Sequence, residues 1–255
     1  MTDKTSSWEP VSEWYDKAVG NKGHYYHENI VLPKTMQLLD LQKDEKQSLL
    51  DLACGQGVLS RHLGKEVAYE GVDISSSLIQ SAHRQKKHPH HKFHVADLNQ
   101  PLSLKKKDFS HAVILLALQN IAKGHVAIQS AYDHLDKGGK LLIALNHPCF
   151  RIPRQSSWGI DEKNNIQYRR MDRYFSSMEI PILAHPSQKE KSSTSLTYHH
   201  SLSTYFLWLK KAGFLVEVLE EWCSDKKSTG KQAKREDRSR KEFPLFLAIV
   251  AVKGP

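Results

Sequence analysis

The chain has 255 residues, of which 39% are apolar, so it can bury one sizeable hydrophobic core and hardly two. No run approaches the roughly 18 uninterrupted apolar residues that cross a bilayer, and residues 1–10 are polar. We therefore expect a soluble, unprocessed, cytoplasmic protein. Its three cysteines are far apart and form no Cys-x-x-Cys pair, which indicates neither a disulfide framework nor a zinc site.

The formal charge of +9 is compatible with an anionic partner such as a nucleic acid. The basic residues are nevertheless spread along the chain, and the densest run, 225–241, also carries acids. We expect that run to be a solvated, mobile loop. Nucleic-acid binding remains the alternative, and the oligomeric state is left open.

Short apolar runs alternate with helical patterns in the first part of the chain, an order typical of βαβ units around a parallel sheet. The apolar runs predict strands at 48–53, 67–72, 91–95, 109–116 and 140–145. Apolar residues at helical spacing predict three helices between these strands. The first is at 58–63, the second begins after Ser75, which is a candidate N-cap, and the third is at 121–135. Gly138-Gly139 is expected to end the last of these helices.

Residues 146–197 break the alternation, because they contain several prolines and aromatic residues without sustained periodicity. A structureless loop this long is uncommon unless it has a function. We therefore expect residues 147–197 to form a lid over the acceptor pocket that largely determines the substrate.

Regular patterns return after this stretch. Apolar spacing predicts a helix from Leu202 to Ala212, ended by Gly213. Two β-rich segments follow at 214–222 and 243–252, with no helical pattern between them. They should pair antiparallel at the edge of the sheet.

The candidate chemistry begins at residues 49–57, LLDLACGQG, where a strand ends in an acid and turns through glycines into a helix. Glycines let the backbone come close to a ligand, and a helix start offers free N–H donors. Asp51 at the strand end can accept a hydrogen bond from an ammonium group, which suits an amino-acid moiety better than a pyrophosphate. An ordinary tight turn is the alternative interpretation.

Two further acids end the next two predicted strands. Asp73, in Gly-Val-Asp-Ile, stands where nucleotide-binding folds hold the two ribose hydroxyls, and Ile74 would then cover one adenine face. Asp97, in Ala-Asp-Leu-Asn, is placed to accept from the adenine amino group. Each acid alone is an ordinary turn residue, but three at successive strand ends beside a glycine turn indicate a nucleotide-like ligand.

The motifs LLDLACGQG, GVDIS, ADLN and AVILLALQNIA, in this order, resemble those of class I S-adenosylmethionine-dependent methyltransferases. The last helix and terminal hairpin are similar to the small-molecule branch that includes quinone-biosynthesis-like enzymes. The resemblance implies one α/β methyltransferase domain over residues 1–255, a doubly wound, mostly parallel, seven-stranded Rossmann-like sheet with an antiparallel terminal hairpin. Residues 1–45 would be helices that cover the cofactor, and the lid would be inserted after strand five.

The resemblance also implies S-adenosyl-L-methionine as the cofactor and no metal. Its methionine part would lie near Asp51, Gly55 and Gly57, and Leu116 would pass near the sulfonium. The predicted cofactor-binding set is Asp51, Ala53, Cys54, Gly55, Gln56, Gly57, Asp73, Ile74, Asp97, Leu98 and Leu116. Further contacts are expected from the N-terminal segment at Tyr15, Tyr25 or Tyr26.

Methyl transfer from a sulfonium chiefly needs an aligned nucleophile and excluded water, and a base only where the acceptor must lose a proton. His147 follows strand five on the ligand-binding side of the sheet and is our first candidate for a base or substrate-orienting group. A structural role for this histidine is the alternative. Lower-ranked candidates are Tyr198, His199 and His200 as polar groups, and Arg151, Arg154, Arg169, Arg170 and Arg173 for a substrate carboxylate or phosphate.

The sequence therefore predicts a methyltransferase that acts on a small-molecule acceptor. An RNA or protein methyltransferase is the closest rival, although no Asn-Pro-Pro-Tyr-like tetrapeptide follows strand four, where Gln119-Asn120 stands. A non-catalytic protein that binds S-adenosylmethionine is a further alternative. A nicotinamide-dependent dehydrogenase is disfavoured because Ser60 stands where its fingerprint needs a third glycine.

Overall fold

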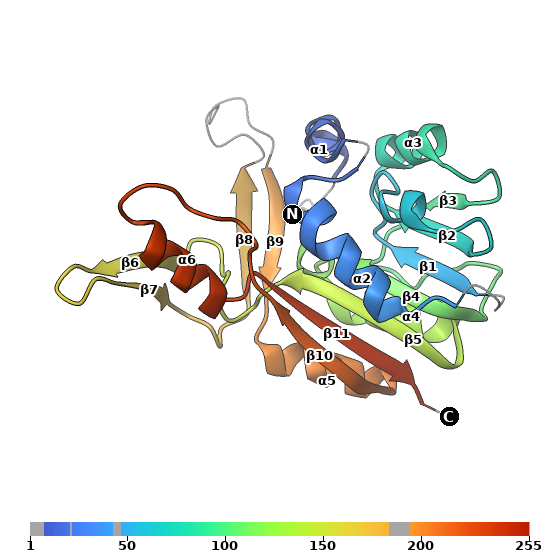
Figure 1. Ribbon diagram of the computed structural model, residues 1–255. Helices are drawn as coiled ribbons and strands as arrows, with labels where there is room; N and C mark the ends of the chain where they lie inside the picture. The colour runs from blue at the N-terminus through green and yellow to red at the C-terminus, as the bar shows by residue number, and fades with distance from the viewer. Residues whose placement is uncertain (1–7, 21, 43–46, 184–193, 255) are drawn as a thin grey trace.

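The computed structural model describes residues 8–20, 22–42, 47–183 and 194–254. Its centre is a seven-stranded sheet with the strand order β10-β11-β5-β4-β1-β2-β3 (Figure 1). The strands are β1 (Ser48–Leu52), β2 (Ala68–Asp73), β3 (Lys92–Val95), β4 (Phe109–Leu115), β5 (Leu135–Asn146), β10 (Phe214–Trp222) and β11 (Phe246–Lys253). Strands β1 to β5 pair in parallel, whereas β11 runs antiparallel to both β5 and β10. This is the expected Rossmann-like architecture with its terminal hairpin.

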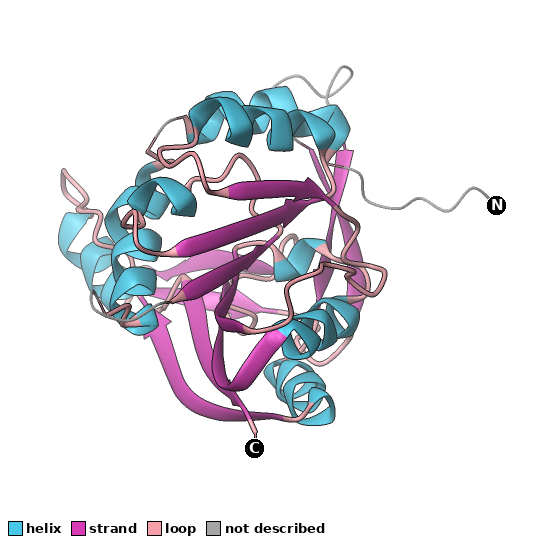
Figure 2. Ribbon diagram, turned by 90° about the vertical axis from the view of Figure 1, so that its right-hand side faces the viewer, coloured by secondary structure: helices cyan, strands magenta, loops and turns pink. Residues whose placement is uncertain are grey.

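Helices cover both faces of the sheet, which is why the inner strands are apolar on both sides (Figure 2). On one face pack α4 (Gly124–His134) and α5 (Leu202–Ala212), and on the other α2 (Leu32–Leu39) and α3 (Ser76–Gln85). Successive residues of β11 alternate between the two cores, since Leu247 and Ile249 face α4 and α5 while Ala248 and Val250 face α2. Among the described residues no helix is both long and apolar enough to cross a membrane.

Two helix ends follow the predicted local signals. The hydroxyl oxygen of Ser75 accepts a hydrogen bond from the backbone N–H of Leu78 and caps α3. Gly213, with φ +100°, ends α5 in the left-handed conformation.

A third predicted helix end was wrong. Helix α4 stops at His134, and β5 begins at the next residue, so Gly138 lies inside a strand. The pairing of β5 with β4 shifts register between Phe109 and His111, and Gly138, with φ +73°, supplies the left-handed residue that this bulge contains.

The chain before the sheet is helical, as expected. It contains η1 (Glu9–Val11), α1 (Ser12–Val19), η2 (His27–Val31) and α2; the predicted helical segment at 58–63 is the short 3-10 helix η3 (Leu59–His62). Parts of the predicted covering segment, residues 1–7, 21 and 43–45, lie outside the described residues.

The stretch at 146–197, whose order the sequence left open, contains regular structure. It contains two antiparallel hairpins, β6 (Ser156–Asp161) with β7 (Ile166–Met171), and β8 (Met178–Leu183) with β9 (Thr194–His199). The first stands apart from the central sheet in Figure 1. Alternation is weak in β6 and β7 because most of their residues are exposed, so sequence periodicity could not reveal them.

The expected loop between the last two strands also contains a helix, α6 (Ala233–Glu242), which contacts β7. Its buried residues are Arg235 and Ser239, and Arg235 donates a hydrogen bond to the side-chain oxygen of Asn165. Ser239 donates to the carbonyl oxygen of Gln167. Because this helix docks through polar groups, its sequence shows no apolar face that would predict it.

Candidate functional site

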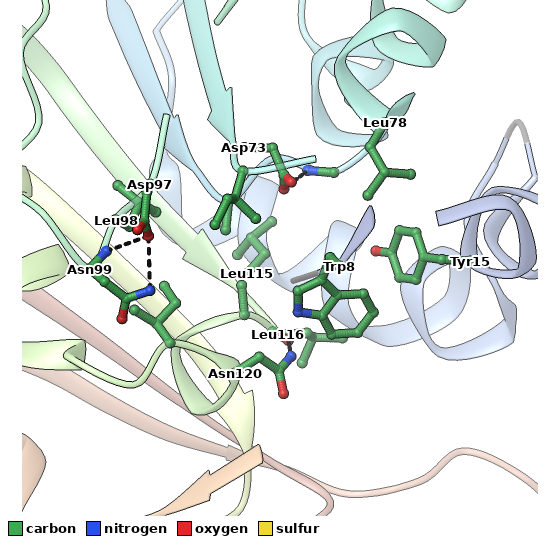
Figure 3. Close-up of a pocket in the computed structure, with 15 residues that line it drawn as sticks. Trp8, Tyr15, Asp73, Leu78, Asp97, Leu98, Asn99, Leu115, Leu116 and Asn120 are labelled. Carbon is green, nitrogen blue, oxygen red and sulfur yellow. Dashed lines mark hydrogen bonds between the residues drawn. The ribbon is translucent and has the colours of Figure 1, made fainter. Parts of the chain in front are cut away.

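A cavity opens at the carboxyl ends of β1, β2, β3 and β4, where the strand order reverses (Figure 3). Open α/β sheets bind ligands at this switch point. With its mouth, this strand-end cavity encloses about 640 Å³ of non-protein space. Its lining residues are Trp8, Tyr15, Ala53, Gly55, Asp73, Ile74, Leu78, Asp97, Leu98, Asn99, Leu115, Leu116, Ala117, Asn120 and Ile121.

The backbone is strained at the two strand ends that flank the switch point. Ala53 after β1 has φ +62°, and Leu116 after β4 has φ +52°. Residues other than glycine rarely adopt this backbone conformation, because it costs of order 1 kcal/mol or more. Where it does occur, it is often at a functional site. Both residues line the strand-end cavity. The strain therefore coincides with the place where the chain turns away from the sheet beside a ligand-sized space.

Asp73 lies at the end of β2 with its carboxylate held by the main chain. Oδ2 accepts a hydrogen bond of 2.9 Å from the N–H of Gly55, and Oδ1 accepts one of 2.9 Å from the N–H of Ser75. Burial raises the pKa of Asp73, and these backbone hydrogen bonds oppose that rise. Each carboxylate oxygen can accept more than one hydrogen bond, so the carboxylate is oriented and still able to bind a hydroxyl.

Asp97 lies after β3, at the opposite side of the cavity from Tyr15 (Figure 3). Its Oδ1 accepts hydrogen bonds from the backbone N–H and the side-chain amide of Asn99. Asn99 in turn accepts from the N–H of Lys123 through its side-chain oxygen. Among the described residues no hydrogen bond reaches Oδ2 of Asp97, which leaves this oxygen available to a ligand donor.

Seven residues of the predicted cofactor-binding set line the cavity: Ala53, Gly55, Asp73, Ile74, Asp97, Leu98 and Leu116. The other four, Asp51, Cys54, Gln56 and Gly57, do not. Gly57 serves packing, because a Cβ there would lie 2.7 Å from the ring of Phe93. The side chain of Gln56 donates to the carbonyl oxygen of Asp16 and so ties the glycine turn to α1.

Asp51 lies beneath the glycine turn. It is 3% exposed, and its Oδ2 accepts a hydrogen bond of 2.7 Å from the hydroxyl of Tyr69. Burial raises its pKa to about 7, although the Tyr69 hydrogen bond opposes the rise. The carboxyl that the sequence assigns to an ammonium group therefore has a pKa close to neutral pH.

Trp8 is a cavity residue that the sequence analysis did not identify. Its indole lies between Leu116 and Tyr15 in Figure 3, and its ring meets that of Tyr15 edge to face at 5.6 Å. The neighbouring Glu9 accepts hydrogen bonds from the hydroxyls of Ser75 and Ser77 at the start of α3. The sequence signal that could have identified Trp8 is a large aromatic residue within an otherwise polar N-terminal segment.

Of the three tyrosines proposed from the N-terminal segment, only Tyr15 lines the strand-end cavity. The hydroxyl of Tyr25 donates to the Asp225 carboxylate, and the Lys226 ammonium lies 4.5 Å from the Tyr25 ring and 4.9 Å from the Tyr26 ring. Tyr26 packs against Phe246. These two tyrosines join the N-terminal segment to the chain after β10.

The structure does not bring His147 to the cavity. Its side chain is buried, Nε2 donates a hydrogen bond of 2.7 Å to Oε1 of Glu221, and Nδ1 accepts from the backbone N–H of Cys149. Burial lowers its pKa. Both ring nitrogens are thus occupied, and the residue links the turn after β5 to β10.

A second cavity, which we call the β9 cavity, lies beyond η4 (Leu118–Asn120). Its lining residues are Gln119, Asn146, Pro148, Arg151, Pro153, Thr197, Tyr198, His199 and Tyr205. Of the predicted lid, therefore, the turn after β5 and strand β9 reach a cavity, whereas β6 and β7 line neither of these two. No group of three or more His, Cys, Asp or Glu residues within the described ranges is arranged to hold a metal ion.

Comparison with known proteins agrees with this geometry. Residues 49–139 match a family described as "Methyltransferase domain". The chain is 26% identical over 157 residues to the ubiquinone/menaquinone biosynthesis C-methyltransferase UbiE of Wigglesworthia glossinidia brevipalpis. That match covers 56% of this chain and 62% of the curated relative.

Solved structures show the same fold. An S-adenosylmethionine-dependent methyltransferase from Mesorhizobium loti superposes with a TM-score of 0.68 at 22% identity, over 88% of this chain and 99% of the other. One from Clostridium acetobutylicum gives a TM-score of 0.59 at 16% identity, over 97% of this chain and 99% of the other. At such identities the likeness establishes the fold.

Proposed function

We propose that this chain, which carries a class I S-adenosylmethionine-dependent methyltransferase domain, transfers a methyl group from S-adenosylmethionine to a small-molecule acceptor. One observation carries the proposal. The strand-end cavity combines two oriented carboxylates, Asp73 and Asp97, with apolar walls at the switch point of the sheet. A nucleoside has the matching chemistry, with a ribose diol, an amino group and a flat apolar base.

The residues present fit that cofactor. The carboxylate of Asp73 would accept from the ribose hydroxyls, and Oδ2 of Asp97 from the adenine amino group. Ile74 and Leu98 would cover the adenine faces, since both line the cavity. Asp51, ionised by a nearby ammonium group, would stabilise the methionine part from beneath the glycine turn, with Tyr69 holding its orientation.

When bound, S-adenosylmethionine supplies a methyl group on a positively charged sulfur, and its S–CH₃ bond breaks with the electron pair staying on sulfur. The chain's own part is alignment and exclusion of water. Trp8 and Tyr15 close the cavity from the N-terminal side, and Leu116 closes it from β4. Glu9, bonded to the serines at the start of α3, keeps this covering segment in place.

One feature supports a small-molecule acceptor. The curated relative is named for quinone biosynthesis, although this chain spans only 62% of its length. An RNA or protein acceptor is the rival.

Two measurements test the proposed function. Calorimetry should detect binding of S-adenosylhomocysteine and not of NAD, and a metabolite screen should release S-adenosylhomocysteine with a small acceptor. Binding of NAD without any response to S-adenosylhomocysteine would contradict the cofactor assignment. Turnover with RNA or protein alone would move the assignment to the rival acceptor class.

A further inference from the structure

We propose that the β9 cavity is the methyl-acceptor site, that it takes a small molecule carrying an oxyanion bound by Arg151, and that Nδ1 of His199 accepts the acceptor's proton. The proposal rests on the proposed function and adds to it a substrate class and a base.

The position of the β9 cavity suits an acceptor, because only η4 separates it from the strand-end cavity. Gln119 lines the β9 cavity, and the next residue, Asn120, lines the strand-end cavity. Both side-chain amides donate to the carbonyl oxygen of Leu116, at 2.8 Å and 3.4 Å. Thr197 of β9 donates to the carbonyl oxygen of Gln119 and fixes the hairpin to this wall. The two cavities therefore lie on either side of η4, and the proposal requires this short segment to move so that the acceptor atom can reach the methyl group.

Arg151 supplies the positive charge of the cavity. Its guanidinium donates a hydrogen bond of 2.7 Å to Oδ1 of Asn146 and lies 5.4 Å from the ring of Phe246. Burial lowers its pKa, which means that the cation has lost much of its hydration. Within the described residues no carboxylate forms an ion pair with it. A desolvated guanidinium without a counter-ion is well suited to a carboxylate or phosphate, which it can bind through two parallel hydrogen bonds.

His199 is prepared to accept a proton. Its Nε2 lies 2.7 Å from the carbonyl oxygen of Tyr174, and because a carbonyl can only accept, Nε2 carries the hydrogen. The lone pair is then on Nδ1, for which no partner is found among the described residues. Burial lowers the pKa of His199, so the ring is neutral at neutral pH. His199 has the free acceptor nitrogen that His147 lacks.

Gln119 provides a third polar group. Its side-chain oxygen, Oε1, is buried without a hydrogen-bond partner in the described part of the chain, whereas its amide nitrogen is occupied by Leu116. A buried acceptor without a donor lowers stability, because it has lost its hydrogen bonds to water. An acceptor molecule with an O–H or N–H group directed at Oε1 would satisfy it. The aromatic rings of Tyr198 and Tyr205 complete the wall.

In the proposed step the acceptor's O–H or N–H proton passes to Nδ1 of His199, and the electron pair left on the acceptor atom forms the bond to the transferred methyl carbon. The S–CH₃ bond breaks at the same time, and its electron pair stays on the sulfur, which becomes a neutral thioether. His199 becomes a protonated imidazolium and returns the proton to water when the product leaves. Arg151 keeps the oxyanion in place and takes no part in the proton transfer.

The binding test uses 4-hydroxybenzoate, salicylate and 3-hydroxybutyrate, each beside its methyl ester, titrated into the complex with S-adenosylhomocysteine and followed by NMR. We expect at least one acid to bind about tenfold or more tightly than its ester, the size of one charge-assisted hydrogen bond. Arg151→Gln should abolish the preference and Arg151→Lys should keep part of it. Arg84→Gln is the matched control, because Arg84 is exposed and lines neither cavity.

Failure of the wild-type protein to bind S-adenosylhomocysteine would refute the proposed function itself. Normal S-adenosylhomocysteine binding with no acid preferred over its ester, or with a preference that survives Arg151→Gln, would overturn the oxyanion site alone.

The base is tested without turnover by ¹⁵N NMR of the histidine rings. His199→Gln identifies the His199 signal and preserves a donor to the Tyr174 carbonyl, while His200→Gln is the control at the neighbouring ring, which bonds Ser177. We expect His199 to be neutral with Nε2 protonated at pH 7. A ring protonated on Nδ1, or fully charged, at pH 7 would overturn its role as base.

Discussion

The hydroxyl of Tyr69 donates a 2.7 Å hydrogen bond to Oδ2 of Asp51. This bond links the neighbouring parallel strands β2 and β1 beneath the glycine turn. Burial raises the pKa of Asp51 to about 7 from its usual 3.8, and the hydrogen bond from Tyr69 favours the charged form and opposes this rise. Asp73 raises it further through like-charge repulsion. The carboxyl therefore titrates where ligand binding can change its charge.

Removing the phenolic hydroxyl should raise the pKa of Asp51 further. In Tyr69→Phe the charged carboxylate loses its donor, so the midpoint of the Asp51 titration, followed by ¹³C NMR of the carboxyl, should move above that of the wild type. An unchanged midpoint would show that the hydrogen bond has no preference for the charged form.

The same carboxyl should make stability fall as pH rises. Its pKa is higher in the folded than in the unfolded protein, so its favourable contribution is complete below about pH 4 and is lost as pH rises through about 7. We expect the free energy of unfolding of the wild type, relative to Asp51→Asn, to decrease between about pH 5 and about pH 8 in urea titrations. A difference that stays constant or grows with pH contradicts the assignment.

Asp73→Ala should weaken S-adenosylhomocysteine binding by about 1–3 kcal/mol, because ribose hydroxyls would be left unpaired in a partly desolvated site. The carboxylate also holds the N–H groups of Gly55 and Ser75, so the melting temperature is measured alongside calorimetry. Asp108→Asn, at an exposed carboxyl paired with Lys106, is the control. Equal affinity in the folded Asp73 variant would exclude it as the ribose ligand.

Trp8 should report ligand binding directly. Its indole lies inside the strand-end cavity, so S-adenosylhomocysteine should change the intrinsic fluorescence, and Trp8→Phe should remove most of that change. Trp158→Phe is the control, because Trp158 lies in β6, away from the strand-end cavity, and packs against Phe243 at the end of α6. A fluorescence response that persists in Trp8→Phe would place the ligand elsewhere.

We expect that the basic run at 225–241, after β10, does not bind nucleic acid. Replacing Lys226, Lys227, Lys231 and Lys234 with Gln should leave S-adenosylhomocysteine affinity within about twofold, since none of these residues lines the strand-end cavity. A steeply salt-dependent affinity for RNA in the wild type that disappears in the variant would favour the nucleic-acid alternative.

The sequence by itself determined the order of the strands that form the central sheet, the helices between them and the acids at three strand ends. These features are local: apolar periodicity identifies β1 and β4, and the cap at Ser75 and the stop at Gly213 act within one helical turn. Because parallel strands bring their carboxyl ends to one edge of a sheet, Asp73 and Asp97 were predictable as cavity residues.

Only the tertiary structure decided which polar side chains face the cavities. His147 and His199 both belong to the segment that follows β5, and sequence ranked the first above the second. Glu221, distant in the chain, and the backbone N–H of Cys149 occupy the two ring nitrogens of His147. The carbonyl oxygen of Tyr174 occupies Nε2 of His199, and Nδ1 of His199 has no partner within the described ranges. Such hydrogen bonds depend on partners far apart in sequence, and no periodicity encodes them. Helix α6, which docks through Arg235, and the position of Trp8 over the strand ends could not be predicted for the same reason, because both depend on contacts between distant parts of the chain.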